Sequence, residues 1–251
     1  MNAPDSSLPV TAAMLAIGDE LLSGRTKDKN IGHLADTLTT AGIDLKEVRI
    51  VPDEEPAIVE ALNALRQRYD YVFTSGGIGP THDDITADAV ARAFGVPCGH
   101  DPAAMDLLAA HYAARGIEFT EARKRMARMP VGAAHIENRV SKAPGFVIGN
   151  VHVMAGVPSV FEAMLDAVLP TLRTGSQMLS SAVDCPFGEG VIGGPLAAIQ
   201  KAHPGVSIGS YPRFDGTGFS TEIVIRSREA AALQAAEDAV REMLQALSQP
   251  A

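Results

Sequence analysis

Residues 71–94 read YVFTSGGIGPTHDDITADAVARAF, and this stretch decides the fold that the sequence predicts. A short β-rich apolar run enters a loop with glycines at positions 76, 77 and 79, and an amphipathic helical pattern follows. A strand, a glycine turn and a helix start together direct unpaired backbone N–H groups at an anion. Asp83 and Asp84, however, lie where a phosphate would be expected, and two anions share a site only around a cation. The stretch therefore predicts a phosphate-and-metal site on an open α/β sheet.

The glycine loop leaves a plainer interpretation open. It lacks the Lys-Ser or Lys-Thr pair of a P-loop and the glycine spacing of a dinucleotide fingerprint. In the plainer interpretation it is a tight turn in which Asp83 or Asp84 caps the following helix. His82 is either a surface side chain or a group that contacts a phosphate or protonates a leaving group. Three glycines, one proline and two acids in nine residues favour a binding site.

Composition bounds the class of protein. The 251 residues allow one large domain or two smaller ones. With 46% hydrophobic residues, 5% aromatic residues and no Trp, the core must consist mainly of small aliphatic side chains, as in helices packed on a parallel sheet. A net charge of −9 argues against a surface that binds nucleic acid or membrane. No window approaches the roughly 18 apolar residues of a membrane span. Cys98 and Cys185 have no metal-ligand spacing, which predicts a reduced, cytoplasmic location.

The chain before the glycine loop alternates strands and helices. The expected elements are a tail over 1–11 without order, a strand over 10–17, a helix over 30–40, a strand over 44–51 and a helix over 53–68. Two such units in about sixty residues predict parallel strands with right-handed crossovers. The loop between the first strand and the first helix, GDELLSGRTKDKN, is longer than an ordinary connection, which favours a function for it.

Beyond the loop, a basic helix is predicted over 121–129. Its side chains Arg123, Lys124, Arg125 and Arg128 form a solvated face or, alternatively, include one or two cations that reach a substrate phosphate. A Gly149-Asn150 pair between apolar runs predicts a hairpin over 146–154. A helix then begins near Pro158, and the turn before it could lie on the same edge of the sheet as the glycine loop.

The pattern changes at about residue 174. The expected elements are a strand over 178–187, a helix over 194–202, a strand over 206–214, a turn at 215–216, a strand over 219–227 and a helix over 229–247. This βαββα order predicts a small α+β domain over 174–251, joined to an α/β domain over 12–173.

Acidic residues follow three of the predicted parallel strands. Asp19 and Glu20 follow the first, Asp53 the second, and Asp83 and Asp84 the third. Ligands of open α/β sheets bind outside the carboxyl ends of the strands, so we expect these acids to converge. An oxygen-rich pocket of this kind suits Mg²⁺ or another divalent ion that grips substrate phosphates. Asp53 or Asp84 would then be a general base or a metal ligand, and both roles stay open.

Four motifs resemble one family. SGGIGPTHDDIT, at 75–86, resembles the signature loop of the molybdopterin-binding (MogA/MoaB-like) domain family. GDELLSGRTKDKN, VPDEEPAI and AGVPS resemble three motifs of its competence/damage-inducible protein CinA branch, in the same order. The resemblance covers roughly residues 14–172. GGIGPTHDD and, further on, SIGSYP at 207–212 are similar to the N-terminal domain of animal and fungal FAD synthases.

The resemblance carries expectations about fold and activity. It implies a three-layer, mostly parallel α/β sheet with helices on both faces and a homo-oligomer, a dimer or trimer. Family members bind pterins or nucleotides, and the CinA branch includes metal-dependent pyrophosphatases acting on ADP-ribose, with related FAD hydrolysis. The two functional aspartates of the family match Asp53 and Asp84, which are expected to be catalytic, and Asp83 and Asp84 are expected to bind metal. The expected ligand- and phosphate-binding residues are Gly18, Asp19, Glu20, Asn30, Ser75, Gly76, Gly77, Gly79, Pro80, Thr81, His82, Gly156 and Pro158.

Three hypotheses about function follow. The leading one is a hydrolase of a nucleotide diphosphate linkage that uses Mg²⁺ or Co²⁺, with K⁺ as a further candidate ion. The second is a non-catalytic binder of molybdopterin or another pterin or nucleotide, and the third is an oligomeric scaffold. Ala155 and Val160 depart from the family pattern. No counterpart of the amidase domain of full CinA proteins is expected within these residues.

Overall fold

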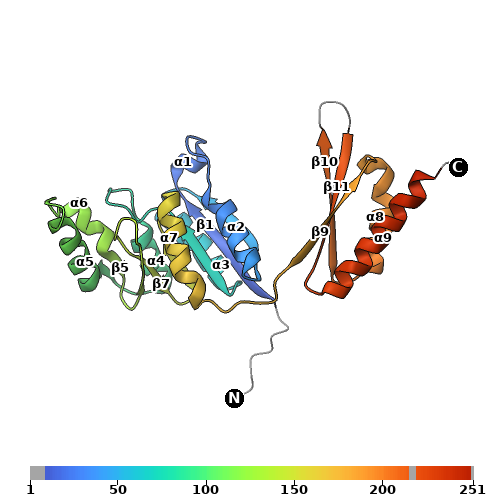
Figure 1. Cartoon of the computed structure of the whole chain (residues 1–251). Coiled ribbons are helices and arrows are strands. Elements are labelled where there is room, and N and C mark those ends of the chain that lie inside the picture. Colours follow the sequence, from blue (N-terminus) through green and yellow to red (C-terminus); the bar gives the residue numbers. More distant parts are fainter. Residues whose placement is uncertain (1–8, 215–218, 250–251) are drawn as a thin grey trace, which may run out of the picture. The chain divides into compact units, whose positions relative to one another are not determined.

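The computed structural model describes residues 9–214 and 219–249, which form two compact units that divide between Gly175 and Ser176 (Figure 1). The predicted boundary, between 173 and 174, lies two residues earlier. Most of the predicted N-terminal tail, residues 1–8, lies outside the described residues. Val10 and Thr11 already belong to the first strand, so the tail ends before them.

The first unit is built on a six-stranded sheet in the order β2-β1-β3-β8-β7-β6. The elements that build it are β1 (Val10–Ile17), α1 (Asp19–Leu22), α2 (Asn30–Thr40), β2 (Ile43–Val51), α3 (Glu55–Arg66), β3 (Tyr71–Ser75), α4 (Thr86–Phe94), β7 (Gly145–Ile148), β8 (Val151–Met154), α7 (Pro158–Val168) and the short 3-10 helix η2 (Leu169–Thr171). The pairs β2-β1, β1-β3 and β3-β8 are parallel, whereas β7 pairs antiparallel with β8 and with β6 (Ala134–Ile136). The predicted hairpin at Gly149 is confirmed.

Helices cover both faces of this sheet because its central strands are apolar on both sides. In β1, Leu15 and Ile17 pack with α3 and α4, while Ala12 and Met14 pack with α2 and α7. The two helix faces bury their side chains at helical spacing, for instance Leu34 and Leu38 in α2. The predicted three-layer, mostly parallel α/β fold is therefore confirmed. The long loop after β1 holds one turn of helix, α1, which the sequence did not predict.

The chain between α4 and β7 forms a small excursion beside the main sheet. It comprises β4 (Cys98–His100), α5 (Pro102–Ala113), α6 (Glu121–Lys124), the 3-10 helix η1 (Arg125–Ala127) and β5 (Arg128–Pro130), after which the chain rejoins the main sheet as β6. The predicted basic helix over 121–129 is wrong in length, since its α-helical part ends at Lys124 and the 3-10 helix that continues it ends at Ala127. Pro130 disfavours helical geometry at Met129, and residues 128–130 pair with β4 instead.

The second unit is a three-stranded antiparallel sheet with two helices, which confirms the predicted small α+β domain. Its elements are β9 (Leu179–Cys185), α8 (Glu189–Ala202), β10 (Val206–Phe214), β11 (Phe219–Ser227) and α9 (Ala230–Ser248), with sheet order β10-β11-β9. The helix predicted from 194 begins earlier, at Glu189. Ile192 and Leu196 are both buried one helical turn apart, so the residues before Pro195 are drawn into the helix. The predicted turn at 215–216 lies outside the described residues.

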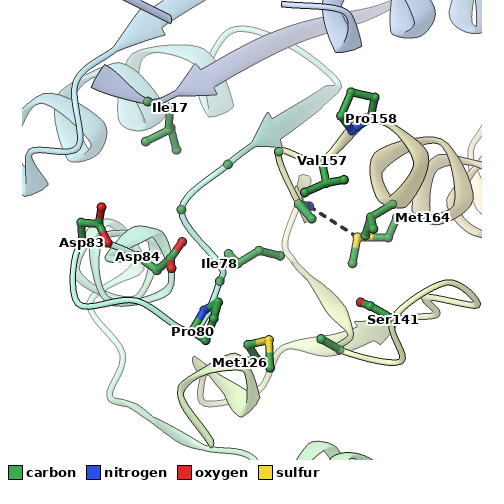
Figure 2. Close-up of a pocket in the computed structure, with 18 of the residues that line it drawn as sticks. Ile17, Ile78, Pro80, Asp83, Asp84, Met126, Ser141, Val157, Pro158 and Met164 are labelled. Carbon is green, nitrogen blue, oxygen red and sulfur yellow. Dashed lines mark hydrogen bonds between the residues drawn. The ribbon is translucent and has the colours of Figure 1, made fainter. Parts of the chain in front are cut away.

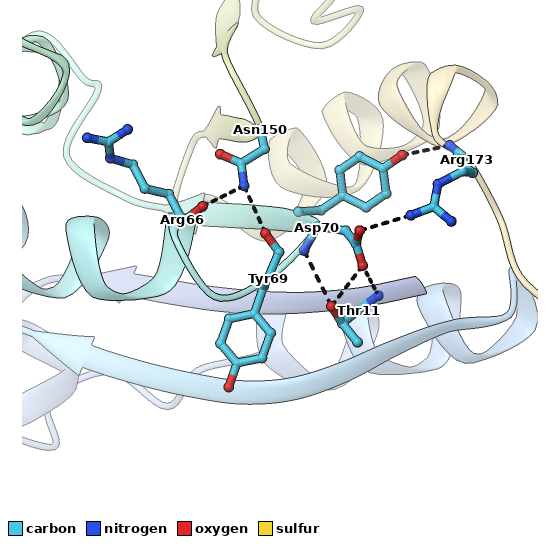
Figure 3. A network of polar contacts seen from close by, with 7 residues as sticks. Thr11, Arg66, Tyr69, Asp70, Asn150 and Arg173 are labelled. Carbon is cyan, nitrogen blue, oxygen red and sulfur yellow. Dashed lines mark hydrogen bonds and ion pairs between the residues drawn. The ribbon is translucent and has the colours of Figure 1, made fainter. Parts of the chain in front are cut away.

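A network of hydrogen-bonded polar groups lies at the amino-terminal ends of β1 and β3, which we call the amino-terminal edge of the main sheet (Figure 3). Both Asp70 oxygens are used: Oδ2 accepts from Thr11 N at 2.8 Å and Thr11 Oγ1 at 2.9 Å, and Oδ1 accepts from Arg173 Nη2 at 2.9 Å. Arg173 N also donates to the Tyr71 hydroxyl at 2.7 Å. Burial works to raise the pKa of Asp70, but the hydrogen bonds from Thr11 and the charge of Arg173 outweigh it, and the pKa is lowered.

Within the described ranges, no helix combines the length and the apolar character needed to cross a membrane.

Candidate functional site

The site lies where the strand order of the main sheet reverses. The chain runs from β1 to β2 on one side and then returns to β3 on the other side of β1. A crevice forms at such a point, outside the carboxyl ends of the strands. The turn after β1 is joined to the end of β2 by two contacts, from Gly18 N to Val51 O at 3.1 Å and from Asp19 N to Asp53 Oδ2 at 3.0 Å. The first two of the three predicted acidic turns therefore meet.

The glycine loop after β3 packs its backbone directly on its neighbours. Gly76 has φ +111°, and a Cβ there would lie 2.2 Å from the carbonyl oxygen of Ile17. A Cβ at Gly77, with φ +68°, would lie 2.1 Å from Thr86 Oγ1. Only glycine fits both positions, because a side chain would force the end of β1 and the start of α4 away from the loop.

Hydrogen bonds hold the ends of this loop and leave its middle free. Gly76 N donates to Met154 O at 3.1 Å, Thr86 Oγ1 donates to Gly76 O at 3.0 Å, and Thr86 N donates to Gly77 O at 3.0 Å. The amides of Gly77, Ile78 and Gly79 donate to no other residue in the described part of the chain. The three free amides are therefore available to an anion, as the sequence predicted.

Asn30 joins three turns of the rim. It is 3% exposed, and its Nδ2 donates to Ser75 Oγ and to Gly156 O, both at 2.8 Å. Asn30 and Ser75 line a small adjoining cavity of about 60 Å³, with Lys27 and Lys29. Asn30 therefore holds together, by hydrogen bonds, segments that lie far apart in the sequence.

The acidic turn is closed by its own side chains and does not cap α4. The N-terminal cap of α4 is Ile85, with no side-chain hydrogen bond, so the capping interpretation is wrong. Asp84 Oδ2 instead accepts from Thr81 N at 2.8 Å and from Thr81 Oγ1 at 2.6 Å. The His82 side chain is 99% exposed and lies 4.0 Å from the Asp83 carboxylate, which favours its interpretation as a surface side chain.

The basic residues after 120 are occupied elsewhere. Arg125 Nε donates to Thr81 O at 2.9 Å, and its Nη2 donates to Asp84 O at 3.1 Å. Arg128 pairs with Asp88, Lys124 pairs with Glu121, and Arg123 donates to the carbonyl oxygen of Glu118. None of the four lines the pocket described next.

These turns enclose a pocket of about 600 Å³ (Figure 2). Predicted site residues that line it are Gly18, Glu20, Asp53, Gly76, Gly77, Gly79, Pro80, Asp83, Asp84, Gly156 and Pro158. Predicted site residues that do not line it are Asp19, Asn30, Ser75, Thr81 and His82. The pocket lies in the first unit, and that its lining residues bind a ligand stays a prediction.

The pocket has an acidic end and an apolar end. Four carboxylate side chains line the first, those of Glu20, Asp53, Asp83 and Asp84, and the described lining includes no Lys or Arg. The apolar end is lined by Ile78, Met126, Ala143, Ala155, Val157, Val160 and Met164, and the lining also includes the buried Asn138 and the exposed Ser141. Figure 2 shows Asp83 and Asp84 on one side of the loop and Val157, Ser141 and Met164 on the other.

The carboxylate of Asp53 shows that the acidic turns repel one another. Burial raises its pKa, and the charges of Glu20, Asp19 and Asp83 raise it further, against the hydrogen bond from Asp19 N. Among residues 9–214 and 219–249, no three acidic, histidine or cysteine side chains lie close enough together to hold a metal ion. A cation at this end would therefore bind through fewer carboxylates, with waters and ligand oxygens completing its shell.

Several residues of the pocket were missed from the sequence. Met126 and Ser141 come from the excursion between α4 and β7, and Met164 comes from α7, where its spacing predicted only a core residue. Thr86 and Arg125 hold the glycine loop without lining the pocket. Thr86 lies two residues after the acidic pair, so its place close to a glycine turn was a usable signal. No local pattern marks Met126 or Ser141.

Comparison with known proteins identifies the family. The family described as "Probable molybdopterin binding domain" matches residues 13–174. The chain belongs to the molybdopterin-binding domain family. In this family member the matched region includes the glycine loop, all three acidic turns and the Gly156 turn. Residues 177–249 match a second family, described as "FAD synthase, middle domain", so the small second unit has known relatives too.

Proteins from several organisms are similar to this chain. A protein of Aeropyrum pernix is 34% identical over 247 residues, which cover 94% of this chain and 90% of the relative. A protein of Caldivirga maquilingensis is 39% identical over 166 residues, covering 64% of this chain and 65% of the relative. Among solved structures, the protein CinA with unknown function from Thermoplasma acidophilum superposes with a TM-score of 0.59 at 32% identity, covering 64% of this chain and 96% of that one.

Proposed function

We propose that this protein catalyses the metal-dependent hydrolysis of a nucleotide pyrophosphate linkage of the ADP-ribose or FAD type. One observation carries the proposal: three free amides at Gly77, Ile78 and Gly79 adjoin four carboxylates in a pocket without a lining Lys or Arg. The amides favour a phosphate, and the carboxylates repel one unless a cation lies between. An Mg²⁺ or Co²⁺ ion satisfies both requirements.

Each part of the pocket has a role in this proposal. The glycine loop holds the phosphates, and Asp83 and Asp84 provide carboxylate ligands. A divalent ion, when bound, neutralises phosphate charge and lowers the pKa of a coordinated water. Asp53 accepts a proton from the attacking water, and its raised pKa makes it the stronger base. The apolar end around Met126 and Met164 gives the planar ring of the nucleotide a dry surface.

The test is a hydrolysis screen. The protein is incubated with ADP-ribose, FAD and NAD, each with Mg²⁺ or Co²⁺ and with K⁺ present, and AMP release is measured by chromatography. Asp84→Asn should abolish turnover, while Asp106→Asn, on the exposed side of α5, should leave it unchanged. Metal-dependent AMP release that is lost only in the Asp84 variant supports the proposal. Undiminished turnover of Asp84→Asn contradicts it.

A second candidate function is binding of molybdopterin or another pterin without catalysis. The apolar end of the pocket, with Ser141 at its rim, favours it because a pterin is a flat ring with polar edges. Pterin fluorescence that stays with the purified protein, together with no hydrolysis in the screen, would select this candidate. A homo-oligomeric state and a cytoplasmic location stay predictions, and mass measurement in solution tests the first of these.

A further inference from the structure

Arg125 reaches from the excursion to both ends of the acidic turn. Its Nε donates to Thr81 O at 2.9 Å and its Nη2 donates to Asp84 O at 3.1 Å. The same turn is closed on its other side, where the Asp84 carboxylate accepts from Thr81 N and Oγ1. The segment that carries Asp83 is therefore held between a guanidinium and a carboxylate.

The Arg125 guanidinium hydrogen-bonds the backbone of the turn and does not act through an ion pair in the described residues. It pairs with no carboxylate in the part of the chain that the structure describes, although its charge lies near Asp83. It does not line the pocket either, so it does not contact a ligand there. A charged group that donates to two carbonyl oxygens makes hydrogen bonds stronger than neutral ones. The two bonds fix the backbone of the turn from outside the pocket.

We propose that Arg125 is a positioning residue that sets the Thr81–Asp84 turn, so that Asp83 and Asp84 present their carboxylates to a divalent cation. This inference rests on the proposed function. Without the guanidinium, Asp84 O loses its donor and Thr81 O keeps only Asp84 N, at 3.3 Å, so the turn is less firmly held and its two carboxylates can move away from the cation. The planar fork of arginine matches two acceptors at once, whereas the single nitrogen of a lysine does so less well.

Arg123 provides a matched control. It lies in α6 next to η1 and also makes two contacts, a hydrogen bond to the Glu118 carbonyl and a stack over the Tyr112 ring at 4.8 Å from the centroid. Neither contact reaches the acidic turn. Arg123→Ala therefore removes an arginine that also makes two contacts, from the same segment, and leaves the contacts of the acidic turn unchanged.

The first measurements use Mn²⁺ alone and no substrate. Arg125→Ala, Arg125→Lys and Arg123→Ala are compared with the unmodified chain by electron paramagnetic resonance of bound Mn²⁺ and by hydrogen exchange of residues 77–85. Supporting residues of metal sites typically contribute about 10- to 100-fold in affinity. We expect Arg125→Ala to weaken Mn²⁺ binding by about this factor and to speed exchange in the turn. Arg125→Lys should lie between, and Arg123→Ala should change Mn²⁺ affinity by less than about twofold.

Rescue separates positioning from a general structural role. Guanidinium ion added at millimolar concentration should restore part of the lost Mn²⁺ affinity and AMP release to Arg125→Ala and none to Asp84→Asn. Raising the metal concentration should likewise recover the turnover of Arg125→Ala, because the defect lies in holding the metal. A loss of turnover that neither guanidinium nor excess metal repairs overturns the proposal.

The outcomes distinguish this inference from the function beneath it. If the chain hydrolyses ADP-ribose and Arg125→Ala binds Mn²⁺ as tightly as the unmodified protein, the inference alone fails. If nothing is hydrolysed but Mn²⁺ binding depends on Arg125 as expected, the proposed hydrolysis alone fails. If the unmodified chain binds no Mn²⁺, both fail.

Discussion

The two ends of the main sheet treat their carboxylates in opposite ways. At the amino-terminal edge, Asp70 is fully paired with Thr11 and Arg173, and its pKa is lowered. At the carboxyl-terminal edge, Asp53 has one backbone donor, faces other carboxylates, and has a raised pKa. A carboxylate paired with an arginine has its charge balanced within the fold. In the described residues the four carboxylates of the pocket form no ion pair with a Lys or Arg, so they leave negative charge for something else to balance. The comparison locates the candidate site independently of any motif.

The largest effect should come from the acidic end. Asp84→Asn keeps an acceptor for Thr81 but removes a metal-binding charge, so we expect AMP release to fall by about 100-fold or more. Hydrogen exchange in β1 and β3 should stay within the scatter of ordinary surface variants, about 0.5 kcal/mol. If Asp84→Asn lost turnover because the sheet became less stable, this carboxylate would support the fold as Asp70 does. The contrast between the two ends of the sheet would then disappear.

A buried histidine between the two edges should make the sheet sensitive to acid. His152 stacks on Phe73 at 5.2 Å between ring centroids, and burial lowers its pKa to about 4. Because the unfolded state binds the proton first, stability is complete above about pH 6.5 and is lost as pH falls towards 4, by up to about 3 kcal/mol. Hydrogen exchange of β1 amides across this range measures the loss.

Two variants test the source of that acid sensitivity. His152→Phe, which cannot take up a proton, should remove most of the dependence between pH 6.5 and 4. His82→Gln, at a fully exposed loop position, should leave the dependence as it is. Equal acid sensitivity of the unmodified chain and His152→Phe would assign the effect to other groups.

Removal of the Asp70 carboxylate at the amino-terminal edge should lower the free energy of unfolding and leave AMP release unchanged. Asp70→Ala leaves Arg173 and the Thr11 hydroxyl without their acceptor, and since solvent screens this partly exposed site we expect a loss of about 1 kcal/mol. Urea-induced unfolding monitored by hydrogen exchange in β1 and β3 measures it. AMP release per folded molecule should equal that of the unmodified chain, and a fall in turnover would mean that the two edges are coupled.

The smallest effect on stability is expected at Asp53, and it has the opposite sign. Asp53→Asn keeps an acceptor for Asp19 N and removes one of several repelling charges. We therefore expect stability at pH 7 to be unchanged or slightly raised, while AMP release is lost. Thermal unfolding with and without Mg²⁺ checks this, because Mg²⁺ should stabilise the unmodified chain more than the variant. A destabilised Asp53→Asn would show that this carboxylate supports the fold.

Much of the fold followed from the sequence because its signals are local. The buried strand at 10–17, the glycine loop and the Gly149-Asn150 turn each occupy a few adjacent residues, and each matches the structure. The errors came where distant residues decide. Met129 pairs with β4 instead of continuing a helix, and the early start of α8 depends on burial of Ile192 against the second sheet.

The same distinction applies to the candidate site. The acidic turns were predicted because parallel strands bring their carboxyl ends to one edge, which topology alone ensures. The apolar wall was missed because Met126 and Met164 reach it from segments whose local patterns say only helix or loop. Asp84 was taken as a possible helix cap, since a sequence shows which acids precede a helix but not which amide each accepts.

The amide group of Asn30 has a wider consequence for how this rim can change. Its nitrogen, at the start of α2, donates to Ser75 at the end of β3 and to Gly156 just after β8. The same side chain therefore holds three loops together. Lengthening or tilting one loop would pull on the other two. New ligand preferences are then easiest to acquire by substitutions at the apolar end of the pocket, around Met126 and Met164, which Asn30 does not hold.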